Sequence, residues 1–329
     1  MKRKSDLRKE SSNCEMVLKK IIIDTDPGQD DALAIMTAFG SESLNVLGIT
    51  CVAGNVPLNL TTKNALKICE LTGKEEIPVF RGCEKPLERT LVTAEHVHGK
   101  TGLDGIELRL KNKKIEKDKA SDFIVKTLLE SDENKITLCA LGPLTNIATA
   151  ILREPKIVVH IEEIILMGGG FFEGGNITPA AEFNIYVDPE AAKIVLSSGV
   201  KIAMLPLDVT HKTLVDREFL RKLRSSGKNS AIEAAKLLDF FERYDIQKYG
   251  SQGGPLHDPN VIVYLLNPEI YKGKLVNVEV EIKSDLTRGM TVVDWWGVTS
   301  RPKNVYYINE VNSRDFFNQV LTNVLNLPK

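Results

Sequence analysis

Four aspartates follow an apolar run near the N-terminus, and their spacing is the strongest chemical signal in the sequence. Asp24, Asp26, Asp30 and Asp31 fall within eight residues, around a Pro-Gly turn. A helix start would favour acids at Asp30 and Asp31, but it leaves the first two unexplained. Carboxylates this close repel one another unless a cation lies between them. Because oxygen ligands select calcium or magnesium over zinc or copper, the segment predicts a site for a hard divalent cation.

A second interpretation of the same segment is a phosphatase. An apolar strand followed by Asp-x-Asp also opens the haloacid-dehalogenase-type phosphatases, where the first aspartate is a nucleophile and magnesium is the cofactor. The continuation Pro-Gly-Gln-Asp-Asp at 27–31 does not fit that loop, and no later lysine and acidic pair can be assigned. A magnesium phosphatase built on Asp24 and Asp26 therefore stays as the first alternative.

Apolar runs of strand length alternate with amphipathic stretches of helical length along the chain. Strands are predicted at 20–23, 44–52, 136–141, 163–167 and 201–205, with further strands inside 275–308. Helices are predicted at 30–39, 58–71, 145–153, 189–197, 231–249 and 316–325. This alternation predicts an α/β fold with a mostly parallel sheet flanked by helices. We expect a single large domain at 19–329, preceded by a disordered extension at 1–18.

The polar segments follow the predicted strands. The acidic segment follows the first strand, Gly54 and Asn55 follow the second, Gly142 and Pro143 follow a middle one, and residues 168–184 follow the next. Ligands of open α/β sheets bind beyond the carboxyl ends of the strands. These loops therefore predict one site at that edge of the sheet.

Eight sequence blocks, taken in order over about residues 19 to 326, resemble the nucleoside hydrolase family. They are DTDPGQDD at 24–31, VAGN at 52–55, VHGKTGL at 97–103, LGPLTN at 141–146, LMGGG at 166–170, AEFN at 181–184, DPEAA at 188–192 and LHDP at 256–259. The resemblance implies the nucleoside hydrolase fold. It also implies hydrolysis of the N-glycosidic bond of ribonucleosides to ribose and free base.

The resemblance also implies a role for individual residues. Asp30 would activate a calcium-bound water, and His257 would protonate the leaving base. Asp30 and Asp31 are adjacent at a helix start, so their side chains diverge by about 100°. The implied ligands of one Ca²⁺ are Asp26, Asp31, Asp258 and the backbone carbonyl of Leu141. The implied substrate contacts are Asn55, His98, Met167, Asn176, Glu182, Phe183, Asn184 and Tyr249.

The base preference follows from the predicted helix at 231–249, which should line the base pocket. Tyr249 aligns with a tyrosine that contacts the base in pyrimidine-preferring relatives, which favours uridine and cytidine. Asp245 stands where those relatives carry glutamine, so a purine or broad preference stays open. His98 lies beside Gly99 and Gly102, which indicates a mobile lid, while His96, His160 and His211 are interpreted as structural or solvent-exposed. A non-catalytic nucleoside-binding protein is a further alternative.

The composition argues against a nucleic-acid-binding protein and against a membrane-spanning protein. The formal net charge of −1 does not indicate the excess of basic residues that is typical of nucleic-acid-binding proteins. No apolar run approaches the roughly 20 residues that are needed to span a bilayer. Five cysteines without a C-x-x-C pair favour a reducing compartment, so we expect a cytoplasmic protein. The partners expected are a nucleoside and, as in the family, further copies in a homodimer or homotetramer, with no nucleic acid and no membrane.

Overall fold

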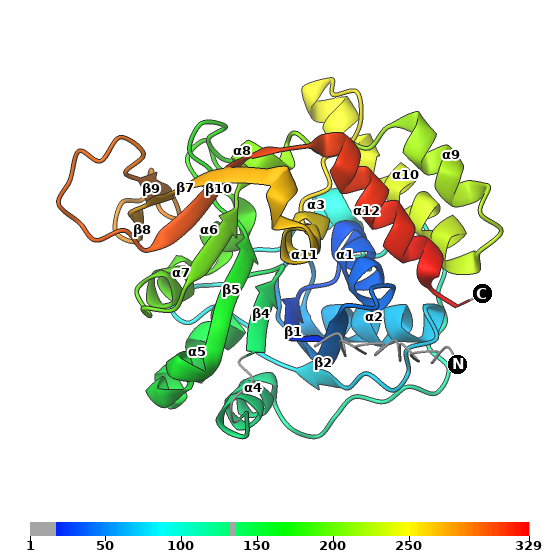
Figure 1. Cartoon of the computed structure of the whole chain (residues 1–329), viewed down its shortest axis with the longest axis horizontal. Coiled ribbons are helices and arrows are strands. Elements are labelled where there is room, and N and C mark those ends of the chain that lie inside the picture. The colour runs from blue at the N-terminus through cyan, green and yellow to red at the C-terminus, as the bar shows by residue number, and fades with distance from the viewer. Residues whose placement is uncertain (1–17, 132–135, 329) are drawn as a thin grey trace, which may run out of the picture.

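An eight-stranded sheet runs through the middle of the computed structural model, which describes residues 18–131 and 136–328 apart from the side chain of Tyr249 (Figure 1). The predicted extension at 1–18 lies outside this part except for Leu18. The strand order is β3-β2-β1-β4-β5-β6-β10-β7, and every neighbouring pair is parallel except β10 and β7. The strands are β1 Lys19–Thr25, β2 Leu44–Cys51, β3 Val79–Arg81, β4 Ile136–Ala140, β5 Ile161–Met167, β6 Ile202–Leu205, β7 Tyr271–Val276 and β10 Val305–Val311. The predicted α/β architecture with a mostly parallel sheet is confirmed.

Helices cover both faces of this sheet, which explains the continuous apolar runs of its central strands. In β1, Ile21 and Ile23 pack into one hydrophobic core and Ile22 into the other, because successive side chains of a strand point to opposite faces. The first core contains α1 Gln29–Phe39, α2 Leu58–Leu71, α9 Arg217–Arg224, α10 Asn229–Tyr249, α11 Pro259–Leu266 and α12 Ser313–Asn326. The second core contains α4 Ala120–Leu129, α5 Thr145–Arg153 and α7 Pro189–Leu196.

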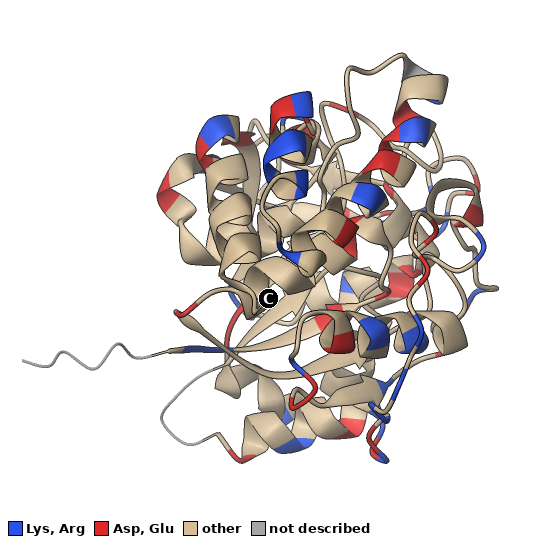
Figure 2. Cartoon of the chain, turned by 90° about the vertical axis from the view of Figure 1, so that its right-hand side faces the viewer, with Lys and Arg blue, Asp and Glu red and all other residues tan. Residues whose placement is uncertain are grey.

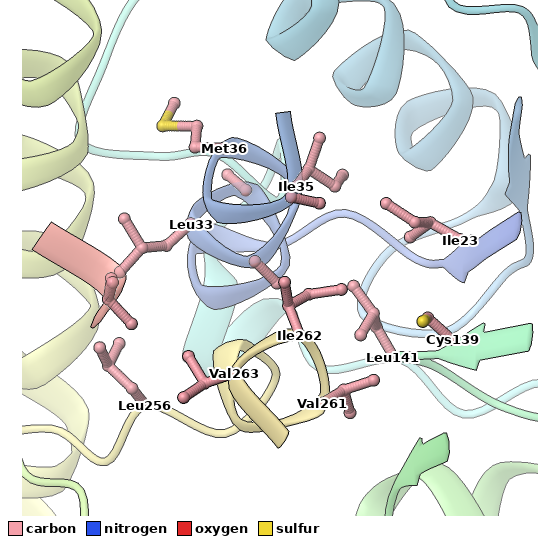
Figure 3. Packing of buried hydrophobic residues seen from close by; sticks show 14 of the residues in the cluster. Ile23, Leu33, Ile35, Met36, Cys139, Leu141, Leu256, Val261, Ile262 and Val263 are labelled. Carbon is pink, nitrogen blue, oxygen red and sulfur yellow. The ribbon is translucent and has the colours of Figure 1, made fainter. Parts of the chain in front are cut away.

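The first core fixes the helix that carries the acidic segment. Figure 3 shows Ile262 and Val261 of α11 close to Leu141, and Leu33 on the side of α1 that faces away from Ile23. All of these residues belong to the first core. All eleven residues of α1 are buried. The N-terminus of α1 therefore has one fixed place relative to β1 and β4.

Shorter elements complete the chain and lie mostly in the loops. They are α3 Glu95–His98, α6 Phe183–Val187, α8 Leu207–Thr210, the 3₁₀ turns Pro155–His160 and Pro268–Ile270, and the two-stranded sheet of β8 Val278–Val280 and β9 Thr291–Val293. Charges of both signs are interspersed along the outer helices of the face in Figure 2. Over the described residues, no helix is both long and apolar enough to cross a membrane.

Candidate active site

A cavity of about 560 Å³ opens at the carboxyl ends of the strands. The predicted site residues that line it are Asp30, Asn55, His98, Leu141, Met167, Asn176, Glu182, Phe183, Asn184, His257 and Asp258. Asp26 and Asp31 are fully buried next to it. Tyr249 was predicted to contact the base, but its side chain lies outside the described part of the structure. The loops that the sequence predicted to meet at one edge of the sheet do meet there.

Buried carboxylates form the floor of the pocket. Asp30, Asp31 and Asp258 each offer one oxygen, and these oxygens lie within 4.8 Å of one another. Burial, followed by the charge of Asp31, raises the pKa of Asp30 to about 8, and burial raises the pKa of Asp258 well above its ordinary value. No Lys or Arg is found among the described residues that line the pocket. The cluster could therefore hold a metal ion, whose charge would favour the ionised carboxylates.

Asp26 extends the cluster and supports a fit to a hard cation. Its Oδ2 accepts a hydrogen bond from the backbone N–H of Asn55 at 2.7 Å. Its Oδ1 is buried and has no partner within the described chain, and a buried polar atom without a partner is costly unless a ligand satisfies it. All the donor atoms gathered here are oxygens, the ligands that calcium and magnesium select.

Two glycines leave room for the Asp26 carboxylate. A Cβ on Gly54 would lie 2.1 Å from Asp26 Oδ2, and a Cβ on Gly142 would lie 2.1 Å from Oδ1. Any larger residue at either position must move the carboxylate. The Gly-Asn and Gly-Pro pairs after β2 and β4 therefore shape the floor of the pocket.

Asn55 ties the loop after β2 to the acidic loop. Its Nδ2 donates to the Asp26 carbonyl and to Asp31 Oδ2, both at 3.1 Å. Asp31 also accepts from Thr25 Oγ1 at 2.5 Å and from the Gly28 N–H at 2.9 Å. These bonds hold Asp31 below the pocket, while Asp30, the next residue along α1, faces into it.

Asp24 does not belong to the pocket lining. Its carboxylate accepts hydrogen bonds from Thr50 Oγ1 at 2.5 Å and from Asn146 Nδ2 at 2.8 Å. Burial raises the pKa of Asp24 to about 7. Asp24 thus joins β1 to β2 and α5, which weighs against the phosphatase alternative, because that alternative needs Asp24 as an exposed nucleophile.

One wall of the pocket is formed by the loop after β5. Glu182 caps α6, accepting from the Asn184 and Gly169 N–H groups at 2.9 Å. Asn184 Nδ2 donates to the Leu141 carbonyl at 2.9 Å and to the Met167 carbonyl at 3.2 Å. Amide and carboxylate groups held in this way present donors and acceptors side by side, which suits a ligand rich in hydroxyl groups.

Another part of the pocket lining carries imidazole and aromatic rings. Thr210 Oγ1 lies 2.8 Å from His257 Nδ1, and the Phe241 ring packs at 5.6 Å from His98 and 6.5 Å from His257. Burial lowers the pKa of His257 well below its ordinary value and that of His98 to about 3. Both rings are therefore neutral. Tyr244 and Asp245 of α10 also line this wall, as predicted, and burial raises the pKa of Asp245 to about 6.

His96 is exposed and His211 is half-buried, in agreement with their interpretation as structural or solvent-exposed, but both also line the pocket, which was not predicted. The His211 ring lies 5.8 Å from His257, and its Nδ1 is 3.1 Å from Glu173 Oε2. The position of His211 in the sequence could have predicted its place in the pocket, because His211 lies in the segment that follows β6, and the other pocket residues also lie in segments that follow strands. His96 gives no such signal, because it belongs to a short helix that no periodicity marks.

Comparison with known proteins gives consistent matches over nearly the whole chain. The family model described as inosine-uridine preferring nucleoside hydrolase matches residues 21–318. An uncharacterized protein of Schizosaccharomyces pombe is 46% identical over 309 residues, 94% of this chain and 100% of its own. The pyrimidine-specific ribonucleoside hydrolase RihA of Photobacterium profundum is 44% identical over 91% of this chain and 96% of its own. The solved purine-preferring ribonucleoside hydrolase of Gardnerella vaginalis has a TM-score of 0.87 and 31% identity, over 93% of this chain and 98% of its own.

Substitution of Gly142, one of the two glycines beside Asp26, tests whether Asp26 binds a cation. Gly142→Ala would push the Asp26 carboxylate aside, because the new methyl group has no room beside Oδ1. We expect divalent-cation affinity to fall about 10–100-fold, as when other supports of metal ligands are removed, with the circular dichroism spectrum unchanged. Calorimetric titration with Ca²⁺ and with Mg²⁺ measures this, and Gly54→Ala is the matched variant on the other side of Asp26. Unchanged affinity in both variants would show that Asp26 takes no part in cation binding.

Proposed function

This chain belongs to the nucleoside hydrolase family, whose members act on N-glycosyl bonds, and on that premise we propose that it hydrolyses ribonucleosides to ribose and free base. The observation that carries the proposal is a single pocket with an acidic floor, a polar wall and an imidazole wall. Such a pocket can bind the sugar and the base at different sides and place a water between them. Pyrimidine nucleosides, uridine and cytidine, are the proposed preferred substrates, in line with the name of the bacterial relative RihA.

Ca²⁺ is the proposed cation. The residues that would hold it are Asp26, Asp31, Asp258 and the carbonyl of Leu141. Calcium takes six to eight oxygens, so four protein groups leave positions for water and for ribose hydroxyls. When bound, the ion would supply positive charge that makes a water more acidic and orients the sugar. The orphaned Asp26 Oδ1 and the absence of a cationic side chain in the described lining support this assignment.

Asp30 is the proposed general base. It lines the pocket, whereas Asp31 beside it is held below by Thr25, Gly28 and Asn55. One aspartate is thus available to take a proton from the attacking water while the other is fixed by the protein. Asn176, Glu182 and Asn184 are the proposed sugar contacts, so that binding energy at the ribose can be realised as its ring gains oxocarbenium character.

His257 is the proposed proton donor to the leaving base. The contact of Nδ1 with Thr210 leaves Nε2 as the ring nitrogen available to a ligand. A neutral ring whose N–H lies on Nε2 can donate a hydrogen bond to the departing base. Negative charge that develops on the base raises the pKa of the ring, so His257 can take up a second proton from solvent and give its Nε2 proton to the base, which leaves the ring neutral again. Cytoplasmic location is proposed with this function, supported by the free thiols of Cys51, Cys69, Cys83 and Cys139.

A hydrolysis panel tests the proposed function. Purified protein with calcium is incubated with uridine, cytidine, inosine, adenosine and guanosine, and released base is separated by chromatography. We expect release of base from all cleaved nucleosides, fastest from uridine and cytidine. Faster cleavage of inosine would overturn the pyrimidine preference alone. Tight binding without turnover would support a binding protein, and phosphate release from p-nitrophenyl phosphate without base release would support the phosphatase alternative.

Asp30→Asn separates the base from the cation ligands. The amide keeps the size and hydrogen bonding of the carboxylate but loses its basicity, so kcat should fall by about 10²–10⁴-fold. The loss should be similar for uridine and for p-nitrophenyl riboside, because both reactions need an activated water. Calcium stoichiometry should stay the same. If the variant instead loses calcium while its metal-loaded fraction keeps its kcat, the roles of Asp30 and Asp31 are exchanged.

His257→Phe tests the other end of the reaction. The p-nitrophenolate leaving group needs no proton, so its riboside should be cleaved nearly as fast as by the unaltered protein. Uridine hydrolysis should slow by about 10²–10⁴-fold, the usual contribution of a general acid. The ratio of kcat values on the two substrates is the readout. An equal loss on both would mean that His257 shapes the pocket and transfers no proton.

A further inference from the structure

Gln29, the residue between the Pro-Gly turn and Asp30, is completely buried and faces His98 across 69 positions of the sequence. Its Nε2 donates to the His98 carbonyl at 2.9 Å and to the Asp104 carbonyl at 3.1 Å. Its Oε1 lies 2.8 Å from Nδ1 of the His98 imidazole. One amide therefore binds both the backbone and the ring of His98.

The two carbonyl groups fix which way round the amide lies. Exchanging its oxygen and nitrogen would place Oε1 against two carbonyl oxygens, where no hydrogen is available to bridge them. Oε1 must then be the atom that faces the imidazole. Because a carbonyl oxygen only accepts hydrogen bonds, His98 Nδ1 must carry a proton.

A neutral imidazole carries a single N–H, so a proton on Nδ1 leaves Nε2 with a free electron pair. His98 is neutral because its burial, followed by the nearby charges of His96 and Arg243, lowers its pKa to about 3. A neutral ring of this tautomer accepts a hydrogen bond through Nε2 and cannot donate one there.

The ring is also held in place on the pocket side. A Cβ on Gly28 would lie 2.3 Å from His98 Nδ1 and 3.0 Å from Asn55 Nδ2, so the ring lies directly over Gly28, close to Asn55. The Phe241 ring also packs against it, with ring centroids 5.6 Å apart. His98 therefore lines the pocket in the neighbourhood of Asn55 and Phe241.

We propose that Gln29 is a positioning residue that holds His98 in the tautomer protonated at Nδ1, so that His98 Nε2 accepts a hydrogen bond from an O–H or N–H group of the bound nucleoside. The proposal rests on the proposed function and deepens it by giving the two pocket histidines opposite tasks. His98 accepts a hydrogen bond and orients the substrate. His257 donates to the leaving base, and His98 cannot replace it in that role.

The tautomer can be measured without substrate. In ¹⁵N-histidine-labelled protein, ring ¹⁵N shifts and long-range ¹H–¹⁵N correlations distinguish a protonated from a bare nitrogen, and His98→Gln identifies the His98 signals among five histidines. We expect a protonated Nδ1 and a bare Nε2. Gln29→Met, which keeps the volume but removes the acceptor, should move both signals toward mixed tautomers.

Asn64→Leu is the matched control, because it removes another amide that holds the loops around Pro27 and Thr101 but leaves the Gln29–His98 hydrogen bond in place. Asn64 is a second buried amide that holds the same loops, donating to the Pro27 and Thr101 carbonyls at 3.1 and 2.7 Å. It makes no hydrogen bond to the His98 ring, so the His98 ring signals should stay as in the unaltered protein. A protonated Nε2 in the unaltered protein, or equal changes in both variants, would overturn the proposal. Since the unaltered protein alone gives the first result, a variant that fails to fold does not remove the test.

Kinetics identify the group that His98 binds. Gln29→Met should raise the KM for uridine about 3–10-fold, the effect of one hydrogen bond, with little change in kcat. If the increase disappears with 5′-deoxyuridine, the donor is the ribose 5′-hydroxyl, and if it persists, the donor is the 2′-hydroxyl, the 3′-hydroxyl or the N–H of the base. A fall in kcat without a change in KM would contradict the positioning role. Absence of any nucleoside cleavage by the unaltered protein would overturn the proposed function, while the ¹⁵N spectra would still decide the tautomer.

Discussion

Repulsion among four buried carboxylates is the constraint on which the rest of the site depends. One oxygen from each of Asp30, Asp31 and Asp258 lies within 4.8 Å of the others, and two unit charges that far apart repel by roughly 3–4 kcal/mol at an effective dielectric constant of about 20. The pairs among these three carboxylates alone would rival the roughly 5–15 kcal/mol that stabilises a whole domain. The described lining supplies no Lys or Arg. The charges must therefore be neutralised by protons or by a cation, and the proposed role of Asp30 as a base would require the cation.

The acidic cluster and the wall that would contact the base stand on different elements of the fold. The acidic floor stands on the loops after β1, β2 and β4 and on the start of α11, all anchored in the first core. The wall that would meet the base is built from α10 and the segments around His98 and His211. If base recognition lies on that wall, substitutions there would change the preferred base without disturbing the floor. The chain is similar both to a relative named as pyrimidine-specific and to a solved structure named as purine-preferring.

The sequence predicted those parts of the structure that local patterns encode. The helices at 58–71 and 145–153 have the predicted bounds because their apolar stripes stop sharply. The helix at Pro259–Leu266 was missed because an almost wholly apolar segment has no periodicity. Eleven of the residues predicted for the site line the pocket, and all of them except Asn176 lie within the sequence blocks that carry the resemblance. Two hydrogen bonds were missed because they leave no local pattern in the sequence. Asp24 and Asn146 are 122 positions apart, and Gln29 and His98 are 69 positions apart.

The melting temperature with and without calcium tests whether a bound calcium ion neutralises the buried carboxylates. Protein stripped with a chelator and dialysed should melt at a lower temperature than the same sample with excess Ca²⁺. At several hundred times the dissociation constant, binding to the folded state adds about 3–4 kcal/mol of stability. Nucleoside hydrolysis should return over the same range of calcium concentration. A stripped protein that melts at the same temperature and keeps full activity, or that proves to contain stoichiometric zinc, would show that calcium does not neutralise these carboxylates.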